Sequence, residues 1–392
     1  MFSDLPIEII RKEIFPHLDE SAKIVLNNVL WNRPIPKYIS DKIQEEICQY
    51  SVNYLKFFKS KIGERVIFYY LSLHCNFAGM KWANEIGYSW CGMICGNVAK
   101  SGNLEVLKWL HENECPWDSR AIAAAAKGGH LEVLKWLHEN NCPWNWDTST
   151  FIGAAENGHL GILKWAQENG CELDYRTCSF AAYGGHLEVV KWLRENGCPW
   201  DKRTCEAAAE SGNLEVLKWA RENGCPWDKR TCEAAADGGH LEVLKWLREN
   251  GCQWNEEMCI AAAEKGQLEV IKWARENGCQ WDKRTCEGAA RNGNLEVLKW
   301  LRKNGCPWDE EIFIVAIKEK QLEVIKWARE NGCEWDKNTC ELAARLGQLE
   351  VFKCGKENGC PWHEQTLIIC KDEKSVEIMN WMMENGWVDD DD

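Results

Sequence analysis

The sequence predicts an all-α fold, a solenoid of about 11–12 stacked helix–turn–helix repeats behind an N-terminal helical segment. The first observation is a period of 27 residues, clearest in the stretch 197–223, which the next unit repeats almost letter for letter. The second is a tryptophan that returns at this interval, as in Trp192, Trp219 and Trp246. The third is length, because 392 residues exceed what one hydrophobic core usually serves.

Composition narrows the class of protein. Apolar residues make up 45% of the chain, which fits an ordered protein, and no run of 18 apolar residues or basic-then-apolar leader occurs. The net charge of −14 opposes binding to polyanions. We therefore expect an intracellular, most simply cytoplasmic, protein with protein partners, no nucleic-acid partner and no membrane association.

The 22 cysteines follow the repeat and not a disulfide or zinc spacing. Two of them fall in each unit, as in Cys198 and Cys205, with six residues between them, where common zinc sites have two. Free cysteine is among the most buried residue types. We expect these thiols to belong to the core; metal binding and disulfide formation are the alternatives.

The first 18 residues form an amphipathic segment outside the clear repeat. Its apolar side chains are Leu5, Ile9, Ile14, Phe15 and Leu18, and Pro6 suits the first turn of a helix. The simple interpretation is a helix that caps the solenoid. The pairing of Leu-Pro-x-Glu-Ile with Ile-Phe-x-x-Leu also resembles an F-box, although one extra residue separates the two halves and the prolines at 34 and 36 shorten the region.

The expected organisation has four parts. An F-box-like helical segment spans 1–40, a helical connection or cap spans 41–75, the repeat solenoid spans 76–388, and an acidic tail spans 389–392. Repeats at the ends of such arrays are commonly atypical because one face has no neighbour. The sequence of 41–75 matches the repeat poorly, as expected for such an end.

Each full unit reads as two antiparallel helices. In the unit that follows Trp200, Asp201 is the expected N-cap of an inner helix of small side chains, and Gly212 is expected to end it in a left-handed conformation. The outer helix spans 214–222, with Trp219 on its buried arc and a charged stripe opposite. Burial against neighbouring units is needed because a lone unit of this size cannot fold.

The sequence of the 27-residue unit resembles the ankyrin repeat. The string from Gly185 to Asp201, G-H-L-E-V-V-K-W-L-R-E-N-G-C-P-W-D, matches the second half of that repeat closely. The unit is six residues shorter than the usual ankyrin repeat, and the missing residues are those of the β-hairpin finger. The resemblance implies a helical stack that binds proteins, and the short Trp- and Cys-rich form is similar to repeats of large DNA viruses and protists.

No catalytic motif occurs in the sequence. Four histidines, His130, His159, His186 and His240, occupy the turn between the two helices, where other units carry asparagine. This exchange favours a hydrogen bond in the turn over acid–base catalysis. We expect no enzymatic activity, no catalytic residue, no cofactor and no metal.

Charged residues at the start of the inner helix differ in sign between units. Such variation along one edge of a solenoid is typical of a partner-binding surface, with unconstrained surface positions as the alternative. The predicted target-binding edge is formed by Lys202, Arg203, Lys229, Arg230, Glu256, Glu257, Lys283, Arg284, Glu310 and Glu311.

Two functional hypotheses follow. In the first, the chain is an adaptor whose F-box-like segment docks the Skp-type subunit of a cullin–RING ubiquitin ligase while the repeats bind a target protein. The docking residues would be Leu5, Pro6, Ile9, Ile14, Phe15 and Leu18. In the second, the chain is an interaction scaffold or host-factor binder without a ubiquitin link, and the N-terminal helices only cap the array.

Overall fold

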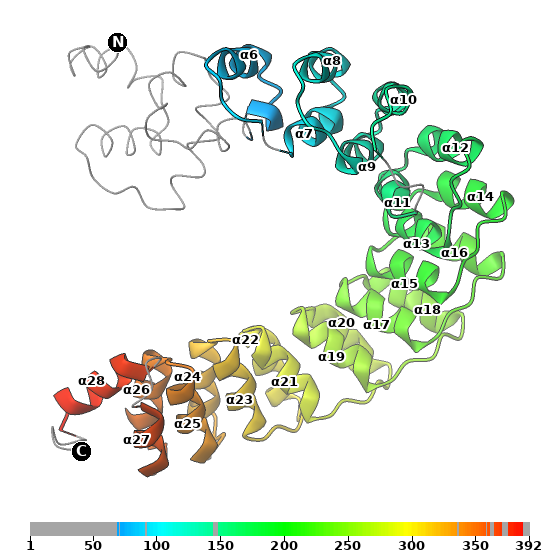
Figure 1. Cartoon of the computed structure of the whole chain (residues 1–392). Coiled ribbons are helices and arrows are strands. Elements are labelled where there is room, and N and C mark those ends of the chain that lie inside the picture. The colour runs from blue at the N-terminus through cyan, green and yellow to red at the C-terminus, as the bar shows by residue number, and fades with distance from the viewer. Residues whose placement is uncertain are drawn as a thin grey trace, which may run out of the picture. The chain divides into compact units, whose positions relative to one another are not determined.

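A computed structural model gives the fold (Figure 1). It describes residues 69, 71–90, 92–143, 148–334, 337–357, 359–360, 364–370 and 375–386. Across these residues the regular structure is entirely helical, as predicted. The F-box-like segment 1–40, nearly all of the connection 41–75 and the acidic tail 389–392 lie outside the described residues, so the expected domain boundaries stay predictions.

The helices alternate between two kinds, an inner and an outer helix in each repeat. The inner helices are α7 (Ile94–Ser101), α9 (Ser119–Gly128), α11 (Thr148–Glu156), α13 (Tyr175–Tyr183), α15 (Lys202–Glu210), α17 (Lys229–Asp237), α19 (Glu256–Glu264), α21 (Lys283–Arg291), α23 (Glu311–Lys318), α25 (Lys337–Arg345) and α27 (Glu364–Cys370). The outer helices are α6 (Phe77–Glu85), α8 (Leu104–Glu112), α10 (Leu131–Glu139), α12 (Leu160–Glu168), α14 (Leu187–Glu195), α16 (Leu214–Glu222), α18 (Leu241–Glu249), α20 (Leu268–Glu276), α22 (Leu295–Lys303), α24 (Leu322–Glu330), α26 (Leu349–Glu357) and α28 (Val376–Glu384).

The chain divides into two compact units that part within α13 and α14. The first unit runs to Thr177 and includes Lys191–Leu193, and the second holds the remaining residues. In the first unit α9 packs between α7 and α11. In the second, α15, α17, α19, α21 and α23 pack one on the next, and each also packs on the outer helix that follows it (Figure 1).

Helix ends follow the predicted chemistry. Asp201 is the N-cap of α15, and its side-chain oxygen accepts from the Arg203 amide at 2.9 Å. Past the end of α15, Gly212 has a φ of 78°, a left-handed conformation that glycine adopts without steric cost. The outer helix α16 has the predicted bounds, Leu214–Glu222. Local sequence signals therefore predicted the start of α15, the glycine turn after it and the bounds of α16.

The core consists of small and branched side chains from both helices of a repeat. In α15 and α16 the buried residues are Thr204, Cys205, Ala208, Ala209, Val216, Leu217 and Ala220. Alanine and cysteine on the inner helices let successive repeats approach closely, because their side chains are short. All described cysteines carry free thiols, and every one except Cys75 is buried, as the repeat pattern predicted.

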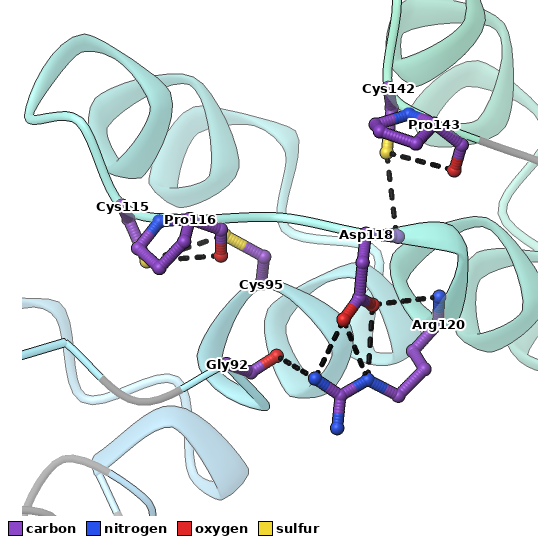
Figure 2. Close-up of polar contacts among 8 residues, drawn as sticks. All are labelled: Gly92, Cys95, Cys115, Pro116, Asp118, Arg120, Cys142 and Pro143. Atoms are coloured by element: carbon purple, nitrogen blue, oxygen red, sulfur yellow. Dashed lines mark hydrogen bonds and ion pairs between the residues drawn. The ribbon is translucent and has the colours of Figure 1, made fainter.

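The thiols that meet are not the pair separated by six residues. Within a repeat, the inner-helix cysteine meets the cysteine that follows the outer helix, and the Cys95 and Cys115 sulfurs lie 3.4 Å apart (Figure 2). Cys259 and Cys279 repeat this contact at 3.5 Å. The cysteine that follows the outer helix also bonds the start of its own repeat, since the Cys225 thiol donates to the Asp201 carbonyl at 3.4 Å. Cysteine therefore joins both helices and the linker in one core.

The prediction that the Trp219 side chain is buried is wrong. Trp219 is only half-buried, as is Trp200 in the linker before it. The two rings meet edge to face with centroids 5.8 Å apart, and the Arg194 guanidinium lies 4.7 Å from the centroid of Trp200. The same arginine–tryptophan–tryptophan stack recurs through Arg302, where the guanidinium is 4.0 Å from the ring of Trp308. These tryptophans pack where neighbouring repeats meet, at the edge of the core.

The turn between the two helices bonds several of the described repeats to the one before. His130 Nε2 donates to the Lys100 carbonyl at 2.9 Å, and Asn213 Nδ2 donates to the Tyr183 carbonyl at 2.8 Å. Histidine and asparagine are therefore equivalent here because either side chain supplies an N–H. The expected turn hydrogen bond is confirmed, and its acceptor belongs to the preceding inner helix.

Candidate interaction surface

The predicted target-binding edge forms one column at the start of successive inner helices. Lys202 and Arg203 open α15, and the corresponding pairs of residues open α17, α19 and α21. In the next repeat Glu310 is the N-cap of α23 and Glu311 its first residue. None of the ten side chains is buried. The structure therefore brings them together along a single accessible edge of the second unit.

Charges in this column pair with those of the adjacent repeat. Lys202 Nζ bonds Asp228, the N-cap of α17 in the next repeat, and Lys283 bonds Asp309, which lies just before the N-cap of α23, at 2.6 Å. Arg284 reaches the preceding repeat, where it contacts Glu257 and, at 3.6 Å, Glu256. Ion pairs between opposite charges along the edge thus link neighbouring repeats, although exposed ion pairs of this kind contribute little to stability.

The pairing also sets the protonation of the capping carboxylates. Burial alone would raise the pKa of Asp228, but hydrogen bonds from Lys202 and from the Arg230 amide outweigh it and hold that pKa below its ordinary value. In the first unit the side chain of Arg120 bonds Asp118 and lowers the pKa of that carboxyl group. Figure 2 shows the same Arg120 donating to the Gly92 carbonyl, at 3.0 Å.

Two exposed aromatic side chains on α13 were missed by the reasoning from sequence. Phe180 is 38% exposed and Tyr183 is 43% exposed, whereas the equivalent residues of the next repeat are Ala207 and Glu210. Exposed aromatics are the side chains that most often dominate protein–protein binding. Comparing the units for their departures from the repeat would have found this pair, because phenylalanine and tyrosine stand where the pattern has small or charged residues.

The register between inner helices places one carboxylate beside this aromatic pair within the second unit. The ninth positions of successive inner helices are neighbours, since Lys127 pairs with Glu156 at 3.5 Å in the first unit and Arg291 pairs with Glu264 in the second. By this register the neighbour of Tyr183 in α15 is the exposed Glu210.

Further carboxylates continue along the same face. Glu206 and Glu233 are half-buried on α15 and α17, and burial raises the pKa of both. The face therefore offers an apolar aromatic patch beside acidic groups. We name the exposed side of α13, α15 and α17, defined by Phe180, Tyr183, Glu206, Glu210 and Glu233, the aromatic–acidic face.

The described residues contain no group of three or more His, Cys, Asp or Glu side chains placed to hold a metal ion. The described helices are also too short or too polar to include a membrane-spanning one. The described surface presents aromatic, acidic and paired charged side chains.

Comparisons with known proteins find similarity over parts of the chain. Family models described as ankyrin repeats match residues 96–177, 205–248 and 259–302. Among solved structures, the human ASB11 ankyrin repeat domain is similar, with 20% sequence identity, a TM-score of 0.38 and coverage of 45% of this chain and 96% of that one. A search of curated proteins finds no significant match.

The fold and the family models answer part of what the sequence predicted. The helical ankyrin-like solenoid is confirmed, and ankyrin repeats are modules of protein–protein interaction. The comparisons give no support for the F-box resemblance or for the viral type of repeat. By its helical hairpins and by the residues that the family models match, this chain is similar to ankyrin-repeat proteins.

Proposed function

We propose that this chain is a protein-binding adaptor whose aromatic–acidic face holds a segment of a target protein. The observation that carries the proposal is the exposure of Phe180 and Tyr183 together on one helix. Burying two aromatic rings at an interface contributes more than most other contacts, and Glu206 and Glu210 favour a target segment that pairs an apolar side chain with a basic one.

Substitution by the residues of the neighbouring repeat tests this face. The double variant Phe180→Ala, Tyr183→Glu copies Ala207 and Glu210, which the fold already accommodates, so folding is expected to persist. Partners recovered by affinity purification with the full chain should be lost with this variant. The matched control is Lys218→Ala on the exposed side of α16, which should keep them. Equal recovery by all three proteins would refute this face as the binding surface.

We further propose that the F-box-like segment docks the Skp-type subunit of a cullin–RING ubiquitin ligase. Support comes from the sequence alone, through Leu5, Pro6, Ile9, Ile14, Phe15 and Leu18. Apolar side chains at these positions would bury against the subunit. A pulldown of the purified subunit with the full chain should succeed and should fail with the double variant Leu5→Asp, Phe15→Asp.

The two parts of the proposal are separable. Absence of subunit binding, or binding that survives the two aspartates, would leave a scaffold that binds proteins without a ubiquitin link. That outcome would not affect the aromatic–acidic face, because Phe180 and Tyr183 act independently of the N-terminal segment.

A further inference from the structure

A groove lies between two outer helices of the second unit, away from the inner-helix surface. It has a volume of about 400 Å³ and is lined by Lys299, Arg302 and Lys303 of α22 and by Trp327 and Asn331 at the end of α24. Three cationic side chains, one aromatic ring and one amide thus share one partly open depression. We name these five residues the basic groove.

Lys303 makes this groove differ from its counterparts in other repeats. The last residue of the other outer helices of full repeats is glutamate, as in Glu222, Glu249, Glu276 and Glu330. Lysine in place of glutamate changes the local charge by two units toward positive. Lys303 is exposed, and the described residues give it no ion pair. One repeat therefore carries an uncompensated cation where its neighbours carry an anion.

The other groups of the basic groove are held in place by contacts. Arg302 Nη1 donates to the Cys306 carbonyl at 3.0 Å while its guanidinium lies over Trp308. Trp327 meets Trp308 edge to face at 5.6 Å, and Asn331 Nδ2 donates to the Trp327 carbonyl at 2.8 Å. The Asn331 side-chain oxygen keeps its capacity to accept a hydrogen bond. Lys299 pairs with Glu296 at 2.9 Å, so the freest positive charge is that of Lys303.

We propose that the basic groove binds a short acidic peptide segment of a protein partner. Carboxylates would pair with Lys303 and Lys299, an apolar side chain would cover the exposed part of Trp327, and a peptide N–H would donate to Asn331. The neighbouring grooves end in glutamate, so the positive region is one repeat wide and suits a few residues better than a nucleic-acid strand. This site is distinct from the aromatic–acidic face and does not depend on it.

Fluorescence anisotropy with the full chain tests the groove. The probe is a fluorescein-labelled peptide Gly-Asp-Glu-Leu-Asp-Glu-Gly, in buffer with about 50 mM NaCl, where screening is weak. We expect saturable binding that weakens about tenfold in Lys303→Glu, which copies the other repeats and should fold normally. Adding Glu276→Lys to that variant rebuilds the same charge pattern one repeat earlier, beside Trp300, and should restore binding.

Controls separate peptide recognition from simple charge attraction. The neutral peptide Gly-Asn-Gln-Leu-Asn-Gln-Gly should not bind, and inorganic phosphate or a short single-stranded DNA should not displace the acidic peptide. The proposal is overturned if the acidic peptide fails to bind, if Lys303→Glu binds it as the wild type does, if Glu276→Lys does not restore binding, or if DNA binds the groove more tightly than the peptide.

Discussion

Thr231 illustrates a conflict between a residue and its surroundings. It is fully buried in α17, and its hydroxyl has no hydrogen-bond partner. A buried hydroxyl that makes no hydrogen bond is unfavourable. Other repeats place Ala121, Met258 and Ile312 at the same point of the inner helix, all of them buried, so an apolar side chain is compatible with this environment.

Replacing this hydroxyl should therefore stabilise the protein. We expect Thr231→Val to raise the free energy of unfolding by about 1 kcal/mol, because a methyl group of similar size replaces an unsatisfied polar atom. Urea unfolding followed by circular dichroism measures the change, and Thr231→Ser, which keeps the hydroxyl and removes a methyl, should destabilise. A loss of stability in the valine variant would show that the hydroxyl makes a favourable interaction.

Cys142 couples the stability of the first unit to alkaline pH. Burial raises the pKa of its thiol from 9.0 to about 12, and the thiol donates to the Asp118 carbonyl at 3.5 Å (Figure 2). The folded protein thus holds the proton more tightly than the unfolded chain does. Its contribution is complete below pH 9 and is lost as pH rises from 9 toward 12.

The corresponding measurement is the free energy of unfolding between pH 8 and a mildly alkaline limit of about 10.5, where each unit of pKa difference corresponds to about 1.4 kcal/mol at most. Wild-type stability should fall over this range. Cys142→Ala should fall less steeply because one titrating thiol is gone. Parallel curves for the two proteins would contradict the assignment of a raised pKa to Cys142.

At the scale of the element, glycines at two helix ends have the same backbone conformation but different neighbours. Gly212 has a φ of 78° and Gly224 a φ of 82°. A Cβ at Gly212 would lie 2.5 Å from His240 Nδ1 in the next repeat, whereas one at Gly224 would meet nothing within 4 Å. Gly212 therefore allows the next repeat to pack closely against this turn, whereas Gly224 only allows its own helix to end in a left-handed conformation.

This pair gives a matched test of how tightly the repeats are joined. Both Gly212→Ala and Gly224→Ala should lose about 1 kcal/mol from the left-handed backbone. Gly212→Ala should lose about 1–3 kcal/mol more because its methyl group displaces His240 from the joint. Thermal unfolding of both variants measures the difference. Equal losses would mean that the turn of one repeat is not packed against the next.

The elements themselves were largely predictable from sequence, because caps and periodicity act locally. Asp201, Gly212 and the bounds of α16 follow from capping and from the spacing of apolar residues. The burial of Trp219 was predicted wrongly, since periodicity identifies which face a side chain is on but not how much of a large ring its neighbours cover. That depends on Trp200 and on the arginine of the preceding repeat.

The candidate surfaces were less predictable for a different reason. The predicted charged edge exists as a column, but sequence could not show that Lys202 and Lys283 bond the next repeat's carboxylates, because this depends on the register between inner helices. Phe180, Tyr183 and Lys303 are visible in the sequence as departures from the repeat. Averaging the units into one repeat pattern hides these departures. Their exposure in the fold is what identifies them as candidate binding residues.

At the scale of the molecule, neighbouring repeats hold one another in place. The inner helices α15, α17, α19 and α21 pack one on the next through buried residues, so one repeat has no separate core. Stability in such an array is a sum of terms between nearest neighbours. A local defect should therefore weaken adjacent repeats most and distant ones least.

Hydrogen exchange followed by mass spectrometry, with and without Ala235→Asp, tests this claim most directly. Ala235 is fully buried in α17, where a carboxylate cannot be solvated. We predict that amide protection falls most in α17 and α18, then in α15, α16, α19 and α20, and least in α23 and α24. Loss confined to α17 and α18, or equal loss throughout the second unit, would contradict the nearest-neighbour account.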